Sequence, residues 1–214
     1  MTRAFYDIAF TPRVLEMQKK QGSDNAYAKF LAPEAPPNDA LTEAEAAFIR
    51  ARDGFYQATV SETGWPYVQY RGGPKGFLHV LDEKTLAYAD FRGNRQYLSV
   101  GNLSADDRIA LFFMDYANRR RLKLLGHART VDAADDPGLI ARLSKPDYRA
   151  TPERAVMIDV AGYDWNCPQH ITERYTRAEI EEAFAPTRQK LASLEAENAS
   201  LKAELAAYAA GARS

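Results

Sequence analysis

The chain has 214 residues, of which 46% are hydrophobic and 27% charged, a composition typical of one soluble globular domain with or without an appendage. The formal net charge of −1 gives no overall basic field, which excludes recruitment of nucleic acid or an anionic membrane by charge alone. The single cysteine, Cys167, excludes an intrachain disulfide and a zinc cage built from cysteines. The N-terminal residues lack the apolar core of a signal peptide, and no apolar run approaches the roughly 18 residues of a membrane span, so we expect a cytoplasmic protein.

The N-terminal part of the chain is predicted to hold helices and a linker. Thr11 and Pro12 resemble an N-cap followed by proline at the first helical position. The proline-rich residues 32–39 predict a connector without regular structure. Thr42, with Glu45 three positions later, predicts a capping box at the start of another helix.

Short runs of aliphatic and aromatic residues, separated by turn clusters, begin at residue 55. This alternation predicts antiparallel strands that must close or pair to hide their edges, so we expect a mainly β fold with a small closed or split barrel of six strands. Two short helices are expected between strands, at 92–102 and 135–143, the first with Tyr97, Leu98 and Val100 facing inward. The predicted strands cover residues 55–60, 65–71 (resumed at 77–81), 86–90, 109–114, 121–131 and 155–162.

A long helix is predicted from Arg177 to Ala210. Apolar residues recur there at spacings of three and four, as at the a and d positions of a heptad, with Asn198 at an a position. Two interpretations stay open, a self-associating coiled coil that reinforces a dimer formed elsewhere and a single helix packed on its own barrel. The recurring residues are Leu191, Leu194, Asn198, Leu201, Leu205 and Tyr208. We therefore expect three parts, with helices and linker over 1–54, the barrel over 55–175 and the C-terminal helix over 176–214.

Signatures of several enzyme classes are missing from the sequence. The histidines His79, His127 and His170 fall in no HExxH motif and in no pair with metal-ligand spacing, so we expect no metal site. His79 and His127 lie in predicted strands, where a structural role is the expectation. The absence of GxSxG, GxGxxG and GxxxxGK[ST] motifs argues against a serine hydrolase, a Rossmann site and a phosphate-binding P-loop.

Basic and small residues gather instead at the ends of predicted strands, in the segments 71–73, 92–95 and 119–121. Glycine lets a backbone approach a ligand closely, and arginine binds phosphate with two N–H groups. If the strands are neighbours, the three segments converge on one phosphorylated ligand; the alternative is that they are solvated turns. Aromatic residues of the same stretch, such as Trp65 and Tyr70, either flank a planar ring system or fill the barrel core.

Five sequence pieces in order resemble the pyridoxamine 5′-phosphate oxidase-like family of FMN-binding split β-barrels. They extend from Phe48 to Val131 and read GWPYVQYRGGPKGF, LDEKTLAYAD, RGNRQ, NL…RIALFF and RRLKLLGHARTV. The resemblance implies a six-stranded antiparallel split barrel of Greek-key type and a homodimer with FMN at the subunit interface. It further implies an FMN-dependent oxidoreductase, with a small-molecule substrate or a nicotinamide donor that the sequence does not identify.

The resemblance also implies which residues hold the flavin. Asn94 and Arg95 match a basic pair that the family places on the FMN phosphate, and because the first is asparagine, the contact is expected to rest on Arg95. Arg121 matches a polar residue that reaches the flavin ring. The implied cofactor-binding set is Gln69, Tyr70, Arg71, Gly72, Tyr88, Ala89, Asp90, Asn94, Arg95 and Arg121.

The C-terminal segment departs from the family pattern. True pyridoxamine phosphate oxidases carry an Arg-x-His element there, whereas His170 and Arg174 in WNCPQHITERY are four residues apart. FMN binding is therefore the expectation with more support, and whether pyridoxamine phosphate is oxidised stays open. Trp165, Cys167 and Gln169 are expected near the flavin edge, with Cys167 as a buried small residue in preference to a thiol beside the ring. The alternative functions are a non-catalytic flavin-binding or stress-related protein and, with less support, a haem-binding split barrel.

Overall fold

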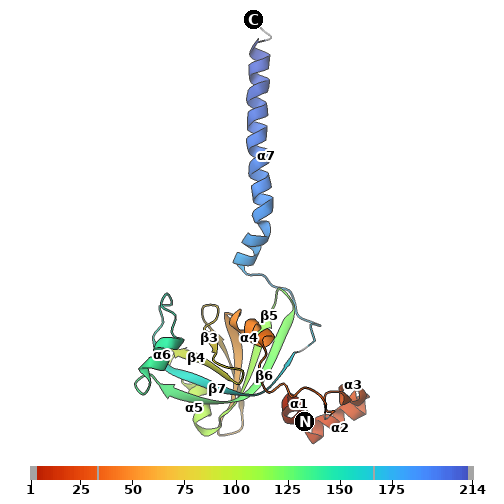
Figure 1. Cartoon of the computed structure of the whole chain (residues 1–214), viewed down its shortest axis with the longest axis vertical. Helices are drawn as coiled ribbons and strands as arrows, with labels where there is room; N and C mark the ends of the chain where they lie inside the picture. The colour runs from red at the N-terminus through yellow and green to blue at the C-terminus, as the bar shows by residue number, and fades with distance from the viewer. Residues whose placement is uncertain (1–3, 33, 166, 212–214) are drawn as a thin grey trace. The chain divides into compact units, whose positions relative to one another are not determined.

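A computed structural model describes residues 4–32, 34–165 and 167–211 of the chain. The chain divides into two compact units, Met1–Ile171 and Thr172–Ser214. The first unit contains the N-terminal helices and an antiparallel sheet, and the second contains one long helix (Figure 1).

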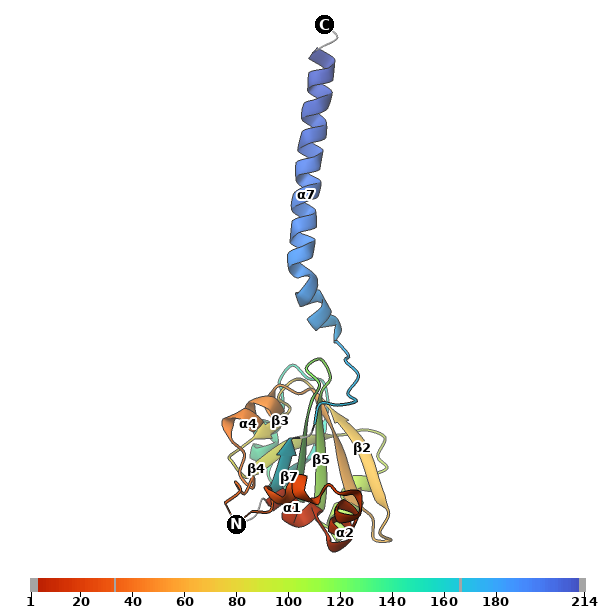
Figure 2. The ribbon, with the colours of Figure 1, turned by 90° about the vertical axis from the view of Figure 1, so that its right-hand side faces the viewer.

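The sheet of the first unit has the order β2-β1-β5-β6-β7-β4-β3, with every neighbouring pair antiparallel. It curls on itself, as the two views in Figures 1 and 2 show, and β2 and β3 end the order, so the barrel is split between them. The mainly β class with flanking helices is thereby confirmed. The strands are β1 (Gly54–Val60), β2 (Pro66–Gly72), β3 (Leu78–Val80), β4 (Thr85–Phe91), β5 (Arg108–Asp115), β6 (Arg120–Asp132) and β7 (Pro152–Trp165).

The expected number of six strands is wrong, because residues 78–80 form a strand of their own. Gly76 has a φ of 72°, in the left-handed region that glycine adopts without strain, and the chain changes direction there. Strand β3 then pairs with β4, with Leu78 opposite Tyr88, and does not continue β2.

The helices of the first unit lie between and beside the strands. The capping box at Thr42 is confirmed. The Thr42 hydroxyl accepts the backbone N–H of Ala44, and the Glu45 carboxylate accepts the backbone N–H of Thr42. Helix α1 was not predicted, since its six residues carry no cap or periodic signal. The helices are α1 (Ala4–Ala9), α2 (Pro12–Gln21), α3 (Asp24–Ala28), α4 (Glu43–Arg50), α5 (Leu98–Ala105) and α6 (Pro137–Leu143).

The core lies inside the barrel, and alternating residues of its strands fill it. On β5, for example, Ile109, Leu111 and Phe113 are buried and the residues between them are not. Each such side chain contributes about 1.5–3 kcal/mol by leaving water. The expectation that Tyr97 and Leu98 face inward is wrong, because they are 40% and 45% exposed. The residues that α5 buries are Ser99 and Leu103.

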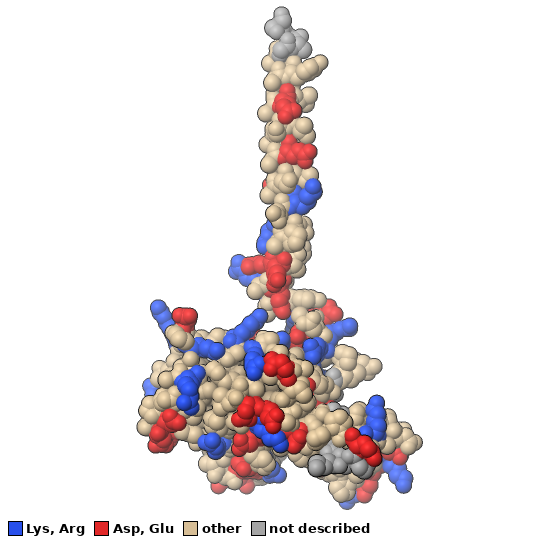
Figure 3. Space-filling view, viewed as in Figure 1, with Lys and Arg blue, Asp and Glu red and all other residues tan. Residues whose placement is uncertain are grey.

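The second unit consists of helix α7 (Arg177–Gly211), which contains Pro186. The predicted long helix is thereby confirmed. No helix in the described part of the chain is both long and apolar enough to cross a membrane. Acidic and basic side chains are interspersed on the face of the protein shown in Figure 3, in agreement with the net charge of −1.

Candidate functional site

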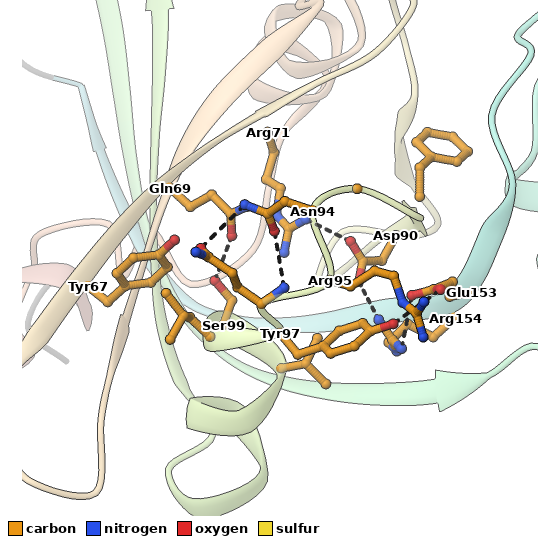
Figure 4. A pocket seen from close by; sticks show the side chains of 15 residues that line it. Tyr67, Gln69, Arg71, Asp90, Asn94, Arg95, Tyr97, Ser99, Glu153 and Arg154 are labelled. Carbon is orange, nitrogen blue, oxygen red and sulfur yellow. Dashed lines mark hydrogen bonds and ion pairs between the residues drawn. The ribbon is translucent and has the colours of Figure 1, made fainter.

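A polar pocket of about 210 Å³ lies where β2, β4, the start of β7 and the start of α5 come together (Figure 4). It brings together residues from three separate stretches of the sequence, and five of the predicted cofactor-binding residues are among them. The lining residues are Tyr67, Gln69, Arg71, Asp90, Phe91, Gly93, Asn94, Arg95, Gln96, Tyr97, Leu98, Ser99, Val100, Glu153 and Arg154.

The pleat of β2 decides which of its side chains reach this pocket. Tyr67, Gln69 and Arg71 lie on one face of the strand and line the pocket, whereas Val68 and Tyr70 point to the opposite face and are exposed. Alternation with a period of two therefore separates Tyr70 from the residues beside it in the sequence. The predicted residues Tyr70, Gly72, Tyr88 and Ala89 line an adjoining pocket of about 170 Å³, which shares Arg71, Asp90 and Phe91 with the first.

The carboxylate of Asp90 lies between two arginines at the floor of the polar pocket. Arg71 donates to Oδ1 of Asp90 at 2.7 Å and Arg154 donates to Oδ2 at 2.8 Å. Asp90 is 5% exposed, so its charge is balanced by these guanidinium groups more than by water. Burial alone would lower the pKa of Arg154, but the hydrogen bond and charge of Asp90 and the charge of Glu153 outweigh it, and the pKa is raised. The two hydrogen bonds hold both guanidinium groups in place.

The loop that carries Asn94 and Arg95 has an unusual backbone. Asn94 accepts the backbone N–H of Gln96 at 3.1 Å, which folds the loop into a tight turn. Arg95 and Tyr97 have φ values of 62° and 53°, a region that residues other than glycine seldom occupy. A hydrogen bond from the Arg95 guanidinium to the Tyr97 side chain raises the pKa of Arg95, as do the charges of Tyr97 and Glu153. Asn94 thus shapes the turn, while Arg95 presents an exposed cation at the rim.

Several residues of the pocket were missed by sequence reasoning. Ser99 donates to Oε1 of Gln69 at 3.0 Å and joins α5 to β2. Tyr97 and Arg92 both donate to Glu153, which lies on β7 far along the chain. The β4–β7 pairing sets Asp90 opposite Arg154 and so brings this part of β7 to the site. No short sequence motif predicts that pairing.

Two predicted residues, Tyr88 and Arg121, do not line the polar pocket. Tyr88 is buried in the core and its hydroxyl donates to Oε1 of Gln57 at 2.6 Å; burial, as the main cause, raises its pKa. Arg121 lies on β6 opposite Met114 and lines neither pocket. Its Nε is buried and has no hydrogen-bond partner among the described residues. One chain therefore does not bring Arg121 to the residues of the polar pocket.

The end of β7 and the described residues that follow it line neither pocket. Trp165 donates from Nε1 to Oε1 of Glu45 at 2.7 Å and so serves the N-terminal helix α4. Cys167 is exposed, so the expectation of a buried small residue is wrong. Gln169 is exposed as well, and its expected closeness to a flavin edge has no support within one chain.

The histidines His79 and His127 have hydrogen-bond partners. Nε2 of His79 lies 3.2 Å from the carbonyl oxygen of Leu143, and burial, followed by the charge of Lys145, lowers the pKa of His79. Nδ1 of His127 lies 2.9 Å from a carboxylate oxygen of Asp107 at the surface. Within the described ranges, no three His, Cys, Asp or Glu side chains are grouped so as to hold a metal ion.

The opposite face of the β2-β1-β5-β6 part of the sheet is apolar and open. Tyr56, Val68 and Tyr70 are exposed on it. An apolar hollow of about 310 Å³ lies beside them, lined among others by Ala58 and Leu125. An exposed apolar surface of this kind is typical of a protein interface.

Comparison with known proteins agrees with the fold. The family model described as "Pyridoxamine 5′-phosphate oxidase" matches residues 41–161. No curated protein matches the chain. Among solved structures, an FMN-binding protein from Syntrophomonas wolfei is 12% identical with a TM-score of 0.46, and the match covers 72% of this chain and 97% of that one.

Two further solved structures are similar to a comparable extent. HupZ of Group A Streptococcus is 16% identical with a TM-score of 0.45, over 63% of this chain and 99% of that one. HutZ, a heme storage protein of Vibrio cholerae, is 15% identical with a TM-score of 0.38, over 58% of this chain and 94% of that one. The sequence match of the family model, which spans more than half of the chain, carries the assignment. The chain belongs to the pyridoxamine 5′-phosphate oxidase family.

Proposed function

We propose that the protein binds FMN in the polar pocket and acts as an FMN-dependent oxidoreductase. The observation that carries the proposal is the convergence of Gln69, Arg71, Asn94 and Arg95 on one pocket in a chain of this family. These residues come from two stretches of the sequence, 69–71 and 94–95, and the resemblance implies a flavin contact for each of them.

The donor set of the pocket fits a phosphorylated ligand. Three arginines and two carboxylates line it, which leaves a net positive charge. Arg71 and Arg154 are ion-paired with Asp90, and Arg154 also with Glu153, so the phosphate would be held chiefly by Arg95 at the rim. Nε of Arg71 is buried, faces no acceptor among the described residues, and offers a further donor.

A second copy of the chain would complete the site. The cavity of about 210 Å³ within one chain is smaller than the roughly 300–1,000 Å³ that ligand pockets usually have. The apolar sheet face with Tyr56, Val68 and Tyr70 would form the interface between the two copies. Arg121, which reaches neither pocket of its own chain, would serve the site across that interface.

FMN supplies hydride transfer when it is bound, and the chain would bind the phosphate, orient the ring and limit access of water. No lining residue is forced into a general acid or base role, in agreement with direct hydride transfer. A haem site has less support, because no histidine or cysteine is among the described residues that line the pocket.

Titration of the purified protein with FMN, followed by flavin fluorescence and absorption, tests the proposal. Arg95→Ala is expected to weaken FMN binding by about tenfold or more, because a charged hydrogen bond to the phosphate is lost. Arg129→Ala, which removes an exposed arginine of β6 outside the pocket, is the matched control. Equal FMN affinity in the two variants would refute the assignment of Arg95.

Two further measurements separate the parts of the proposal. Arg121→Ala should also weaken FMN binding if a second copy completes the site, and unchanged affinity would refute that arrangement alone. Bleaching of bound FMN by NADPH, NADH or a reduced substrate would support the oxidoreductase. A bound flavin that no donor reduces would favour the non-catalytic flavin-binding alternative, and a Soret band without flavin bands would favour haem.

A further inference from the structure

Helix α7 carries an apolar seam that the rest of its own unit leaves exposed. The apolar side chains at its a and d positions are between 46% and 79% exposed. A lone helix in water gains little from such side chains, and apolar residues at this spacing are typical of a helix that packs against another helix. The apolar members of the seam are Ile180, Phe184, Leu191, Leu194, Leu201, Leu205 and Tyr208.

The seam extends N-terminally beyond the six residues from Leu191 to Tyr208. Counting back from Leu191 at an a position, Thr187 takes d, Phe184 takes a and Ile180 takes d. The heptad register therefore runs on through Pro186, which occupies a c position on the outer side of the helix. The extension brings the seam to on the order of four heptads, a length at which a two-stranded coil is plausible in water.

The charges beside the seam match a second copy of the same helix in parallel orientation. In a parallel coiled coil, a g residue faces the e residue five positions later in the partner helix. Lys190 at g would face Glu195 at e, and Glu197 at g would face Lys202 at e. Both pairings are between opposite charges, and each occurs twice because of the twofold symmetry.

An antiparallel pair of the same helices is the competing arrangement. When residues 180–205 of two copies overlap in antiparallel orientation, Asn198 faces Thr187 of the partner and Lys190 faces Glu197, so charge does not separate the two orientations. The pairing of the two Asn198 side chains is what favours the parallel coil, and the cross-linking experiment below distinguishes the two. In the parallel coil, Asn198 faces its own copy, and a polar pair at one a position fixes register and a two-stranded state.

We propose that α7 associates with α7 of a second copy of this chain as a parallel, in-register two-stranded coiled coil. The interaction depends on the apolar seam, on the Asn198 pair and on the g-to-e charge pairs. It is independent of FMN, since none of these residues lines either pocket.

Cross-linking of the full-length chain tests the orientation. In a Cys167→Ser background, Tyr208→Cys places one thiol at a d position near the end of the seam, and Ala203→Cys places it at an outward f position as the control. A short bismaleimide should cross-link the d variant to a dimer and leave the f variant monomeric on denaturing gels. Absence of cross-linked Tyr208→Cys, or equal cross-linking of both variants, would overturn the parallel coil.

Charge reversal tests the specificity of the pairing. In the cross-linkable variant, Lys190→Glu with Glu197→Lys turns every g-to-e pair repulsive and should remove most of the cross-linked dimer. Adding Glu195→Lys and Lys202→Glu restores opposite charges and should restore cross-linking. A dimer that ignores the first pair of changes, or that the second pair fails to restore, would refute the charge pairing.

Hydrogen exchange of the unmodified chain gives a measurement without cysteines. The amides of α7 should be protected at high protein concentration and lose protection on dilution. Leu201→Glu should abolish this protection, whereas Ala203→Glu, at the outward f position, should keep it. Protection that does not change on dilution would show that α7 packs on its own chain and would overturn the proposal. FMN affinity should be the same in all these variants, so failure of the coil is distinguishable from failure of the flavin site.

Discussion

Replacement of Asp90 by asparagine should destabilise the fold, because it removes the counter-charge of the largely buried Arg71 and leaves Arg154 only its longer ion pairs with Glu153 and Asp132. Asp90 is 5% exposed, and the side chains of Arg71 and Arg154 are 16% and 13% exposed. Breaking a buried ion pair from one side costs about 3–5 kcal/mol. Asparagine keeps the volume and still accepts one hydrogen bond, so we expect the lower end, about 3 kcal/mol.

Urea unfolding followed by tryptophan fluorescence and circular dichroism measures this effect. With a denaturant slope of about 2 kcal/mol per molar urea, a loss of 3 kcal/mol lowers the midpoint by about 1.5 M. Asp107→Asn is the matched control, since Asp107 pairs with His127 at the surface, where an ion pair contributes about 0–1 kcal/mol. A shift for Asp90→Asn below about 0.5 M would refute the structural role given to the Arg71–Asp90–Arg154 cluster.

Three more substitutions test other parts of the structure. Burial alone would raise the pKa of Glu45, but its hydrogen bonds outweigh burial and lower the pKa below 4.5. The Glu45 carboxylate therefore stabilises the fold above pH 4.5, and this contribution is lost in more acidic solution. The free energy of unfolding should vary less with pH in Glu45→Gln. Gly126→Ala should lower the melting temperature, because the added Cβ would lie 2.5 Å from the backbone oxygen of Asp159. Tyr88→Phe should cost about 1–3 kcal/mol in urea unfolding, since it removes the hydroxyl that donates to Oε1 of the buried Gln57, and Tyr88→Phe with Gln57→Leu should recover part of the loss. A flat response in any of these measurements contradicts the contact concerned.

The elements that could be predicted from the sequence are those with local signals. The capping box at Thr42, the alternating residues of β5 and the long helix α7 each show a pattern within a few residues, and each is present in the structure. Strand β3 was joined to β2 because a glycine-rich turn between two strands does not reveal whether the second strand continues or changes partner. That choice depends on β4, which is a non-local partner.

The candidate site was predictable only in part for the same reason. The resemblance supplied Gln69, Arg71, Asp90, Asn94 and Arg95, which the structure gathers in one pocket. Residues of β7 enter the site through the β4–β7 pairing, and α5 contributes a serine that no motif marks. The burial expected of Cys167 failed because the chain has left the sheet there, and side-chain type alone does not report that exit.

The carboxylate that closes the cap of α4 also holds the indole of Trp165, at a separation of 120 residues. During synthesis the helix leaves the ribosome long before the end of β7, so its local capping box can form early, whereas the bond from Trp165 forms only when most of the barrel has been made. Helix α4 is then joined to the barrel late, by a contact between residues far apart in the sequence, and such contacts slow folding. A chain released before Trp165 would have all the residues of α4 but would lack the contact that fastens this helix to the barrel.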